Sequence, residues 1–201
     1  MNLVLGCILA YVVSQLLVAA WFAKRVRTET DYLLAGRRLG PWLGTFSVFA
    51  TWYGAETCVA AAGEAYADGV SGVLADPFGY TRGIVAFGLF FAAGLWRRGL
   101  VTLADLFRTR WGVGVERLAA LIMIPSSVMW AAAQIRAFGQ ILASVSEVGL
   151  LAAITIAALV VILYTAIGGM WADAVTDLVQ GIVLIAGIVA LFGVFIALGG
   201  A

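Results

Sequence analysis

Histidine is absent from this chain of 201 residues, and charged residues are scarce. Without histidine the chain lacks the commonest general base and metal ligand, which disfavours haem and metal-centred chemistry. Charged residues make up only 11% of the sequence, whereas an ordinary soluble domain has about 25%. The formal net charge of +1 gives no reason to expect a nucleic-acid partner.

Cysteine is also rare, with only Cys7 and Cys58. Both fall in apolar segments, so we interpret them as small buried hydrophobic residues and not as a disulfide framework. No apolar segment carries a pair of carboxylates, and neither cysteine has a neighbourhood that would activate it. The chain therefore has few side chains that could act as a general acid, a general base or a nucleophile, and we expect that the protein is not an enzyme.

Hydrophobic residues are abundant, at 64% of the chain, and the mean hydropathy is +1.06. These values are typical of an integral membrane protein. A helix needs about 20 mostly apolar residues to cross the hydrocarbon core of a bilayer. Residues 1–201 are thus predicted to form one all-α polytopic transmembrane domain with six helices, at about 3–23, 41–62, 73–95, 118–145, 149–167 and 174–198.

The basic residues predict the orientation, since lysine and arginine are retained in cytoplasmic loops. Two loops contain ten of the twelve: Lys24, Arg25, Arg27, Arg37 and Arg38 in the first, and Arg97, Arg98, Arg108, Arg110 and Arg117 in the second. We therefore expect both termini to lie on the outer (periplasmic) side of the plasma (inner) membrane. The uneven distribution of basic residues between the two sides argues against a dimer of oppositely inserted copies. In the second of these loops, residues 99–107 favour a short amphipathic helix at the membrane surface, capped by Thr102.

The second predicted span contains the stretch F-A-T-W-Y-G-A-E-T, from Phe49 to Thr57. Gly54 weakens a helix interior, and threonine hydroxyls can satisfy backbone groups that a break releases. Unwound backbone in mid-membrane exposes carbonyl oxygens that can bind sodium. The alternative is that Gly54 serves as a close helix contact.

Charges inside predicted spans are costly and ask for a partner or a water-filled cavity. Two alternatives are open for Glu56: it faces a cavity, or it pairs with a cation such as Arg136. Arg136 and Gln140 are four residues apart on one helix face, which we expect to look into the bundle. Arg82 lies in the third predicted span, where it snorkels or forms a structural pair.

The stretch from Tyr164 to Gln180 begins with Y-T-A-I-G-G and predicts a tight turn at Gly168 and Gly169. Asp173, Asp177 and Gln180 then fall on one face of the sixth span. An acid near a helix N-terminus is stabilised by the helix dipole, and this explains Asp173 without a function. Asp177 lies a turn deeper. With Thr176 and Gln180 it forms a polar stripe that can keep an ion's path to the cytoplasm hydrated.

Four motifs in this order resemble the sodium:solute symporter family. They are D-Y-L-L-A-G-R-R-L-G-P-W (31–42), A-T-W-Y-G-A-E-T (50–57), G-E-A-Y-A-D-G (63–69) and Y-T-A-I-G-G…W-A-D-A-V-T-D-L-V-Q (164–180). The resemblance implies a leucine-transporter-type bundle, in which the first span is a leading helix and the other five form the first repeat. It also implies that carbonyls of Ala50 and Tyr53 bind sodium and that Asp177 lines the inner sodium route. Substrate contacts are implied for Thr57, for Glu56 if it faces the cavity, and for Asp76 on the outer side.

The family's second inverted repeat has no counterpart in these 201 residues. The resemblance therefore implies the N-terminal half of a transporter that couples sodium entry to uptake of a small organic solute and is incompetent alone. The missing C-terminal repeat, the solute, sodium and the lipid bilayer are the expected partners, and no cofactor beyond the coupling ion is expected. The alternative is a transporter-like sensor domain of a membrane histidine kinase.

Overall fold

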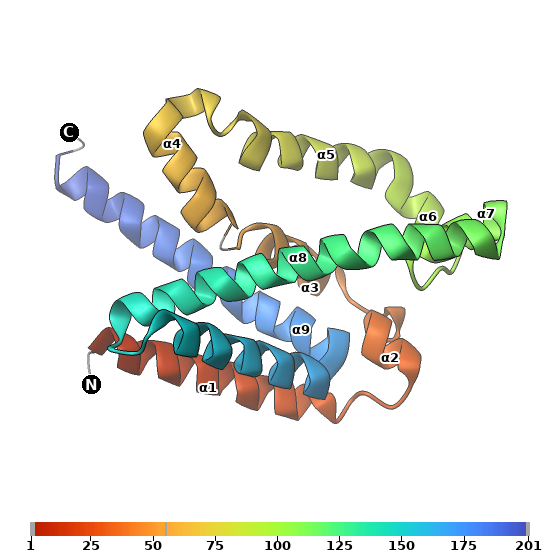
Figure 1. Cartoon of the computed structure of the whole chain (residues 1–201), viewed down its shortest axis with the longest axis horizontal. Helices are drawn as coiled ribbons and strands as arrows, with labels where there is room; N and C mark the ends of the chain where they lie inside the picture. The colour runs from red at the N-terminus through yellow and green to blue at the C-terminus, as the bar shows by residue number, and fades with distance from the viewer. Residues whose placement is uncertain (1–2, 55, 200–201) are drawn as a thin grey trace. The chain divides into compact units, whose positions relative to one another are not determined.

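The computed structural model describes residues 3–54 and 56–199, and for Glu56 it describes only the backbone. Over these ranges the chain is helical and contains no β-strand, which confirms the predicted all-α fold. The longer helices, drawn in Figure 1, are α1 (Leu3–Ala23), α3 (Pro41–Trp52), α8 (Val113–Val145) and α9 (Leu150–Ala197).

Shorter helical segments join these four. They are α2 (Glu29–Leu34), η1 (Ala35–Arg37), η2 (Glu56–Ala61), α4 (Ala62–Asp68), η3 (Gly69–Ser71), η4 (Leu74–Gly79), α5 (Tyr80–Phe87), η5 (Gly88–Ala92), α6 (Ala93–Arg97) and α7 (Leu103–Trp111). Of these, η1 and η3 are 3₁₀ turns, and η2, η4 and η5 are π-helical.

Four stretches are long and apolar enough to cross a membrane by length and composition: Leu3–Ala23, Leu74–Arg97, Val113–Val145 and Leu150–Ala197. The predicted second span is not among them because its helix is interrupted after Trp52. The predicted fifth and sixth spans both lie in α9, which is 48 residues long. The six-span topology and its orientation therefore stay predictions.

The chain divides into two compact units. Unit 1 comprises Met1–Tyr53, Val145–Glu147 and Ala158–Ala201, and unit 2 comprises Gly54–Ser144 and Val148–Ala157. Each unit is described below by itself.

Unit 1 is organised around a sharp break in α9 at Gly169, where φ is 53° and ψ is −158°. Only glycine adopts such angles readily. Tyr32 of α2 fills the space beside it, since a Cβ at Gly169 would lie 2.7 Å from both Cδ2 and the carbonyl oxygen of Tyr32. The Tyr32 hydroxyl donates to the carbonyls of Thr165 and Ala166, at 3.3 and 3.4 Å. The turn predicted at the paired glycines is therefore present, and α2 packs against it.

The part of α9 after this break packs closely against α3 in the same unit. A Cβ at Gly181 would lie 2.5 Å from Cδ1 of Phe46 and 3.3 Å from Cδ1 of Phe49. Small residues allow membrane helices to approach each other in this way. The contact fixes the face of α3 that α9 meets.

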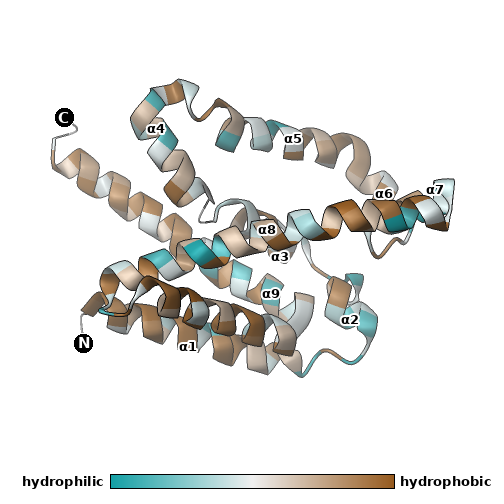
Figure 2. Ribbon diagram, in the orientation of Figure 1, coloured by the Kyte–Doolittle hydropathy of each residue, from teal (hydrophilic) through white to brown (hydrophobic). Residues whose placement is uncertain are grey.

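The residues buried in both units are mostly small. Among the described residues, seven of the eight buried hydrophobic ones are alanines, namely Ala19, Ala35, Ala61, Ala153, Ala157, Ala172 and Ala174. Large apolar side chains are instead exposed along the helices, and Figure 2 shows α1 and α9 mostly in brown. A core of small residues and an apolar surface suit a protein surrounded by lipid.

Within unit 2, α8 meets the first turns of α9 at Gly139. A Cβ there would lie 2.5 Å from Cγ1 and 2.7 Å from Cα of Ile154. The two helices are connected by a short link, so this contact closes an antiparallel-type hairpin of neighbouring helices.

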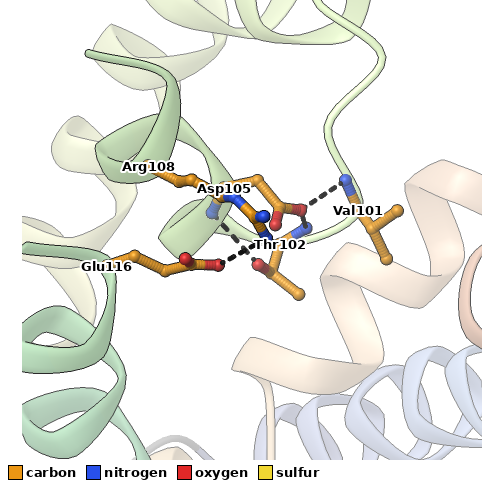
Figure 3. A network of polar contacts seen from close by, with 5 residues as sticks. All are labelled: Val101, Thr102, Asp105, Arg108 and Glu116. Carbon is orange, nitrogen blue, oxygen red and sulfur yellow. Dashed lines mark hydrogen bonds and ion pairs between the residues drawn. The ribbon is translucent and has the colours of Figure 1, made fainter. Parts of the chain in front are cut away.

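The surface helix α7 begins with the cap that the sequence predicts, drawn in Figure 3. Thr102 accepts a hydrogen bond from the Asp105 amide at 3.3 Å, and the Asp105 carboxylate accepts from the amides of Thr102 at 2.7 Å and Val101 at 3.0 Å. This reciprocal arrangement is a capping box. Arg108 and Glu116 form an ion pair of 3.6 Å that connects α7 to the start of α8.

Candidate functional site

The helix break proposed for the F-A-T-W-Y-G-A-E-T stretch is present. Helix α3 begins with Pro41 at its first turn and ends at Trp52, and Tyr53 leaves the helix with φ −94° and ψ 61°. The amide of Tyr53 donates to the carbonyl of Phe49 at 2.8 Å, and the chain resumes as the π-helix η2 from Glu56. The last carbonyls of a helix have no partner within it, and Ala50 lies in this last turn. The break therefore turns backbone oxygen atoms into possible ligands.

Thr51 and Gly54 take the roles expected of them. The Thr51 hydroxyl donates to the carbonyl of Ser47 at 2.8 Å, and the carbonyl of Gly54 accepts from the Cys58 amide at 3.0 Å. Side-chain bonds of this kind satisfy backbone groups where a helix bends or stops. Helix α3 therefore ends before Gly54, and the alternative role of Gly54 as a close helix contact stays a prediction.

Asp177 of α9 is the buried carboxylate of unit 1, with 8% of its surface exposed. Its Oδ2 accepts a hydrogen bond of 2.7 Å from the hydroxyl of Ser47 on α3. Thr176 beside it is 1% exposed and donates to the carbonyl of Asp173 at 2.9 Å. The hydrogen bond between the Ser47 hydroxyl and the Asp177 carboxylate therefore links α9 to α3, the helix that breaks at Tyr53.

Within residues 3–54 and 56–199, no lysine or arginine forms an ion pair with Asp177. A buried carboxylate without a counter-charge is costly in a membrane protein. One hydrogen bond from Ser47 offsets only part of this cost. The site therefore favours a cation near Asp177.

Ser47 was not recognised from the sequence as a site residue. Its position carried a signal, because Ser47 lies three residues before Ala50 and so shares its helix face. A hydroxyl on the face that carries the candidate sodium carbonyls is a reasonable ligand or positioning group. The partner on α9 could not be read from the sequence.

The residues with implied substrate contacts belong to unit 2. Thr57 lies in η2 and Asp76 in η4, and these two segments pack against each other. The backbone at Asp76 is extended, with φ −129° and ψ 122°. The side chain of Glu56 lies outside what the structure describes, so neither its place in the site nor its pairing with Arg136 is tested. The roles of Thr57 and Asp76 also stay predictions.

Unit 2 contains a cavity of about 300 Å³ between η2 and one face of α8. Val59 and Ala60 form one side, and Trp130, Gln134 and Gln140 supply the aromatic and polar groups of the other. Ala133 and Ala137 complete the lining, which includes no charged side chain. The volume is at the lower end of the range for small-molecule sites.

The sequence groups Arg136 with Gln140 on one face expected to look into the bundle. Both side chains are exposed, and Gln140 lines the cavity whereas Arg136 does not. The i and i+4 spacing was therefore too coarse to place Arg136, because the cavity follows Trp130, Gln134 and Ala137 around the helix. Trp130 was missed, since a tryptophan in an apolar span is usually a packing residue.

Arg82 turns back to its own helix. Its Nε donates to the carbonyl of Phe78 at 3.3 Å, and the side chain is exposed. The snorkelling or structural pair expected for Arg82 stays a prediction. Among the described residues, no group of three or more cysteine, aspartate or glutamate side chains could hold a metal ion.

A broken membrane helix beside a buried carboxylate is typical of transporters that move an ion together with a solute. A sequence model of the sodium:solute symporter family matches residues 32–201. The chain therefore belongs to the sodium:solute symporter family, which is a family of transporters and not of enzymes.

Curated relatives agree with this assignment. The chain is 33% identical over 172 residues to "High-affinity choline transporter 1" of Torpedo marmorata, covering 81% of this chain and 29% of the relative. It is 32% identical over 184 residues to the human "High affinity choline transporter 1", covering 86% and 31%. Identity to the "Sodium/sialic acid symporter SiaT" of Proteus mirabilis (strain HI4320) is 27% over 185 residues, covering 90% and 36%. The chain thus spans about a third of the length of these relatives.

Proposed function

We propose that this chain is the first-repeat half of a secondary transporter that couples sodium entry to uptake of a small organic solute. The observation that carries the proposal is the hydrogen bond between Ser47 and Asp177, next to the break that ends α3. Sodium binds at the break through the carbonyls of Ala50 and Tyr53, and Asp177 lies on its way to the cytoplasm. The membrane potential contributes about 2.3 kcal/mol per charge for each 100 mV.

The second half of the site comes from a second repeat. In transporters of inverted-repeat architecture, the ion and solute sites lie where two repeats meet, and access alternates as one bundle moves against the other. The chain covers about a third of the relatives it matches. On this account it supplies the broken helix and Asp177, and coupled transport needs the other repeat as a partner.

The solute we propose is a small quaternary ammonium compound of the choline type. Such a cation cannot accept a hydrogen bond, and proteins recognise it with the faces of aromatic rings, tryptophan best of all. Trp130 offers this ring in the cavity, and the amides of Gln134 and Gln140 can bind a hydroxyl group. Binding of a carboxylate solute usually involves an arginine or lysine side chain, and the lining has neither. Several relatives named as choline transporters support this choice.

Uptake of radiolabelled choline into proteoliposomes under an inward sodium gradient tests this function. The chain alone is compared with the chain continued into a second repeat of the family, and unlabelled proline and sialic acid are used as competitors. We expect sodium-dependent uptake by the continued protein only, with little competition. Uptake by the short chain alone would contradict the half-site, and binding without transport by the continued protein would favour the sensor alternative.

A further inference from the structure

The leading helix α1 carries a buried glutamine whose polar atoms are unused. Gln15 is 8% exposed, and neither Nε2 nor Oε1 has a hydrogen-bond partner in the described part of the chain. Leaving such a group unsatisfied costs about 1–3 kcal/mol. Val13 and Leu17 on either side are 53% and 66% exposed, so Gln15 points away from the apolar surface of the helix. Its amide therefore faces the interior of unit 1 and lacks a ligand there.

Gln15 belongs to a stripe that faces α9. Tyr11, Gln15 and Ala19 are four residues apart and share one side of α1. Ala19 is 1% exposed, and its carbonyl oxygen would lie 3.3 Å from a Cβ at Gly168, just before the break in α9. Figure 1 shows α1 running beside this part of α9. Helix α1 is thus close to α9 at Ala19, and the polar members of the stripe follow toward the N-terminus.

The polar members of the stripe lead to Asp177. Tyr11 of α1 interacts electrostatically with Asp177 of α9. Tyr164 of α9 interacts in the same way with Asp173, Asp177 and Tyr11. Of the two carboxylate oxygens of Asp177, only Oδ2 has a hydrogen-bond partner among the described residues, and this partner is the Ser47 hydroxyl. Asp173 is a second carboxylate near Asp177, and the other groups around it, from Ser47, Tyr11 and Tyr164, are neutral.

We propose that Tyr11 and Gln15 make α1 one wall of a water-filled compartment around Asp177, through which sodium leaves the helix break. Buried waters typically bind polar groups that would otherwise be unsatisfied, which is the state of the Gln15 amide. Oxygen atoms of a glutamine and a tyrosine also suit a hard cation that is partly hydrated. The inference rests on the function proposed above and assigns the leading helix a part in the ion route.

Cysteine accessibility tests this compartment in the chain continued into a second repeat, in membrane vesicles. Cys7 and Cys58 are first replaced by serine, and Tyr11→Cys, Gln15→Cys and Leu17→Cys are made singly. The probe is 2-aminoethyl methanethiosulfonate, a small cation that reacts with ionised thiols in contact with water. Leu17→Cys is the matched control on the apolar side of the same helix turn. Tyr11→Cys provides a second position if Gln15→Cys does not fold.

We expect the cysteines at positions 11 and 15 to react at least about tenfold faster than Leu17→Cys. Sodium should slow both reactions relative to N-methylglucamine, and the slowing should disappear in Asp177→Asn. Reaction at both positions no faster than at Leu17→Cys would overturn the compartment. Fast reaction without any sodium effect would support the compartment and contradict the sodium route of the proposed function.

Discussion

Ser47 of α3 and Asp177 of α9 are 130 residues apart and share a hydrogen bond of 2.7 Å. The bond connects the helix that breaks at Tyr53 with the segment that follows the break at Gly169. Two interrupted helices are therefore joined at a buried carboxylate. This pairing carries the account of an ion route in unit 1.

Removing either member of the pair should weaken sodium binding. In the protein continued into a second repeat, Asp177→Asn and Ser47→Ala should each raise the half-maximal sodium concentration for choline uptake. A hydrogen bond to a charged group is worth about 1.5–3 kcal/mol, which corresponds to roughly tenfold or more. Ser47→Thr keeps the hydroxyl and should restore most of the affinity. Equal losses in Ser47→Ala and Ser47→Thr would contradict the hydrogen bond.

The contact between α9 and α3 should depend on the absence of a side chain at Gly181. Gly181→Ala places a Cβ 2.5 Å from Cδ1 of Phe46, and overpacking of this kind costs about 1–3 kcal/mol. We expect the thermal midpoint of the detergent-solubilised chain to fall by several degrees. Gly187→Ala is the control, because a Cβ there meets nothing within 4 Å. It should leave the midpoint unchanged or raise it, since alanine is the better helix former. Similar losses in both variants would contradict the close packing.

Solute recognition should depend on the ring of Trp130. Trp130→Leu should weaken choline binding by about tenfold, whereas Trp130→Phe should retain part of it. The uncharged analogue 3,3-dimethyl-1-butanol should bind equally to all three proteins, because it has no cation to interact with the ring. Trp111→Leu is the control, since Trp111 stacks on Phe107 and does not line the cavity. If Trp130→Leu weakened binding of the analogue as much as binding of choline, Trp130 would have a packing role instead.

The capping box should stabilise α7 locally. Thr102→Ala should speed hydrogen exchange of the first α7 amides by about fivefold, because loss of an N-cap costs about 1 kcal/mol. Thr102→Ser keeps the acceptor and should exchange nearly as the parent does. Thr109 lies on the same helix and bonds only the carbonyl of Leu106, so Thr109→Ala should have little effect. An unchanged rate in Thr102→Ala would show that the box contributes nothing.

The same helix should respond to acid through Asp105. The hydrogen bond from the Thr102 amide, followed by the bonds from the Val101 amide and the Thr102 side chain, lowers the pKa of the Asp105 carboxyl. Its contribution is therefore present above the unfolded pKa of about 3.9 and is lost as the pH falls through the folded value. Nuclear magnetic resonance titration of the Asp105 carboxyl should give a midpoint below that of Asp105 in the Thr102→Ala variant. Identical midpoints would contradict the assignment.

Local signals in the sequence predicted several features correctly. Gly168 and Gly169 predicted the turn in α9 and Thr102 predicted the start of α7, whereas Gly54 with Thr51 left a break and a close helix contact both open in the second span. Each depends on residues close together in the chain, where glycine conformation and capping chemistry decide the backbone. The membrane class followed from composition alone.

Features that join distant segments could not be read in the same way. The partner of Asp177 is Ser47, and the partner of the α9 turn is Tyr32; both pairs form only when helices pack. Trp130 lines a cavity because η2 lies against one side of α8, and helical spacing alone did not single it out. Spacing identifies a face of a helix but not the neighbour that this face meets.

Solute-stimulated sodium-22 uptake into proteoliposomes tests the central claim most directly. The chain continued into a second repeat is compared with its Asp177→Asn variant and with Asp173→Asn as the control on the same helix. We predict choline-stimulated uptake that Asp177→Asn lowers at least about tenfold at sub-saturating sodium and that Asp173→Asn largely retains. Undiminished uptake by Asp177→Asn would contradict the account.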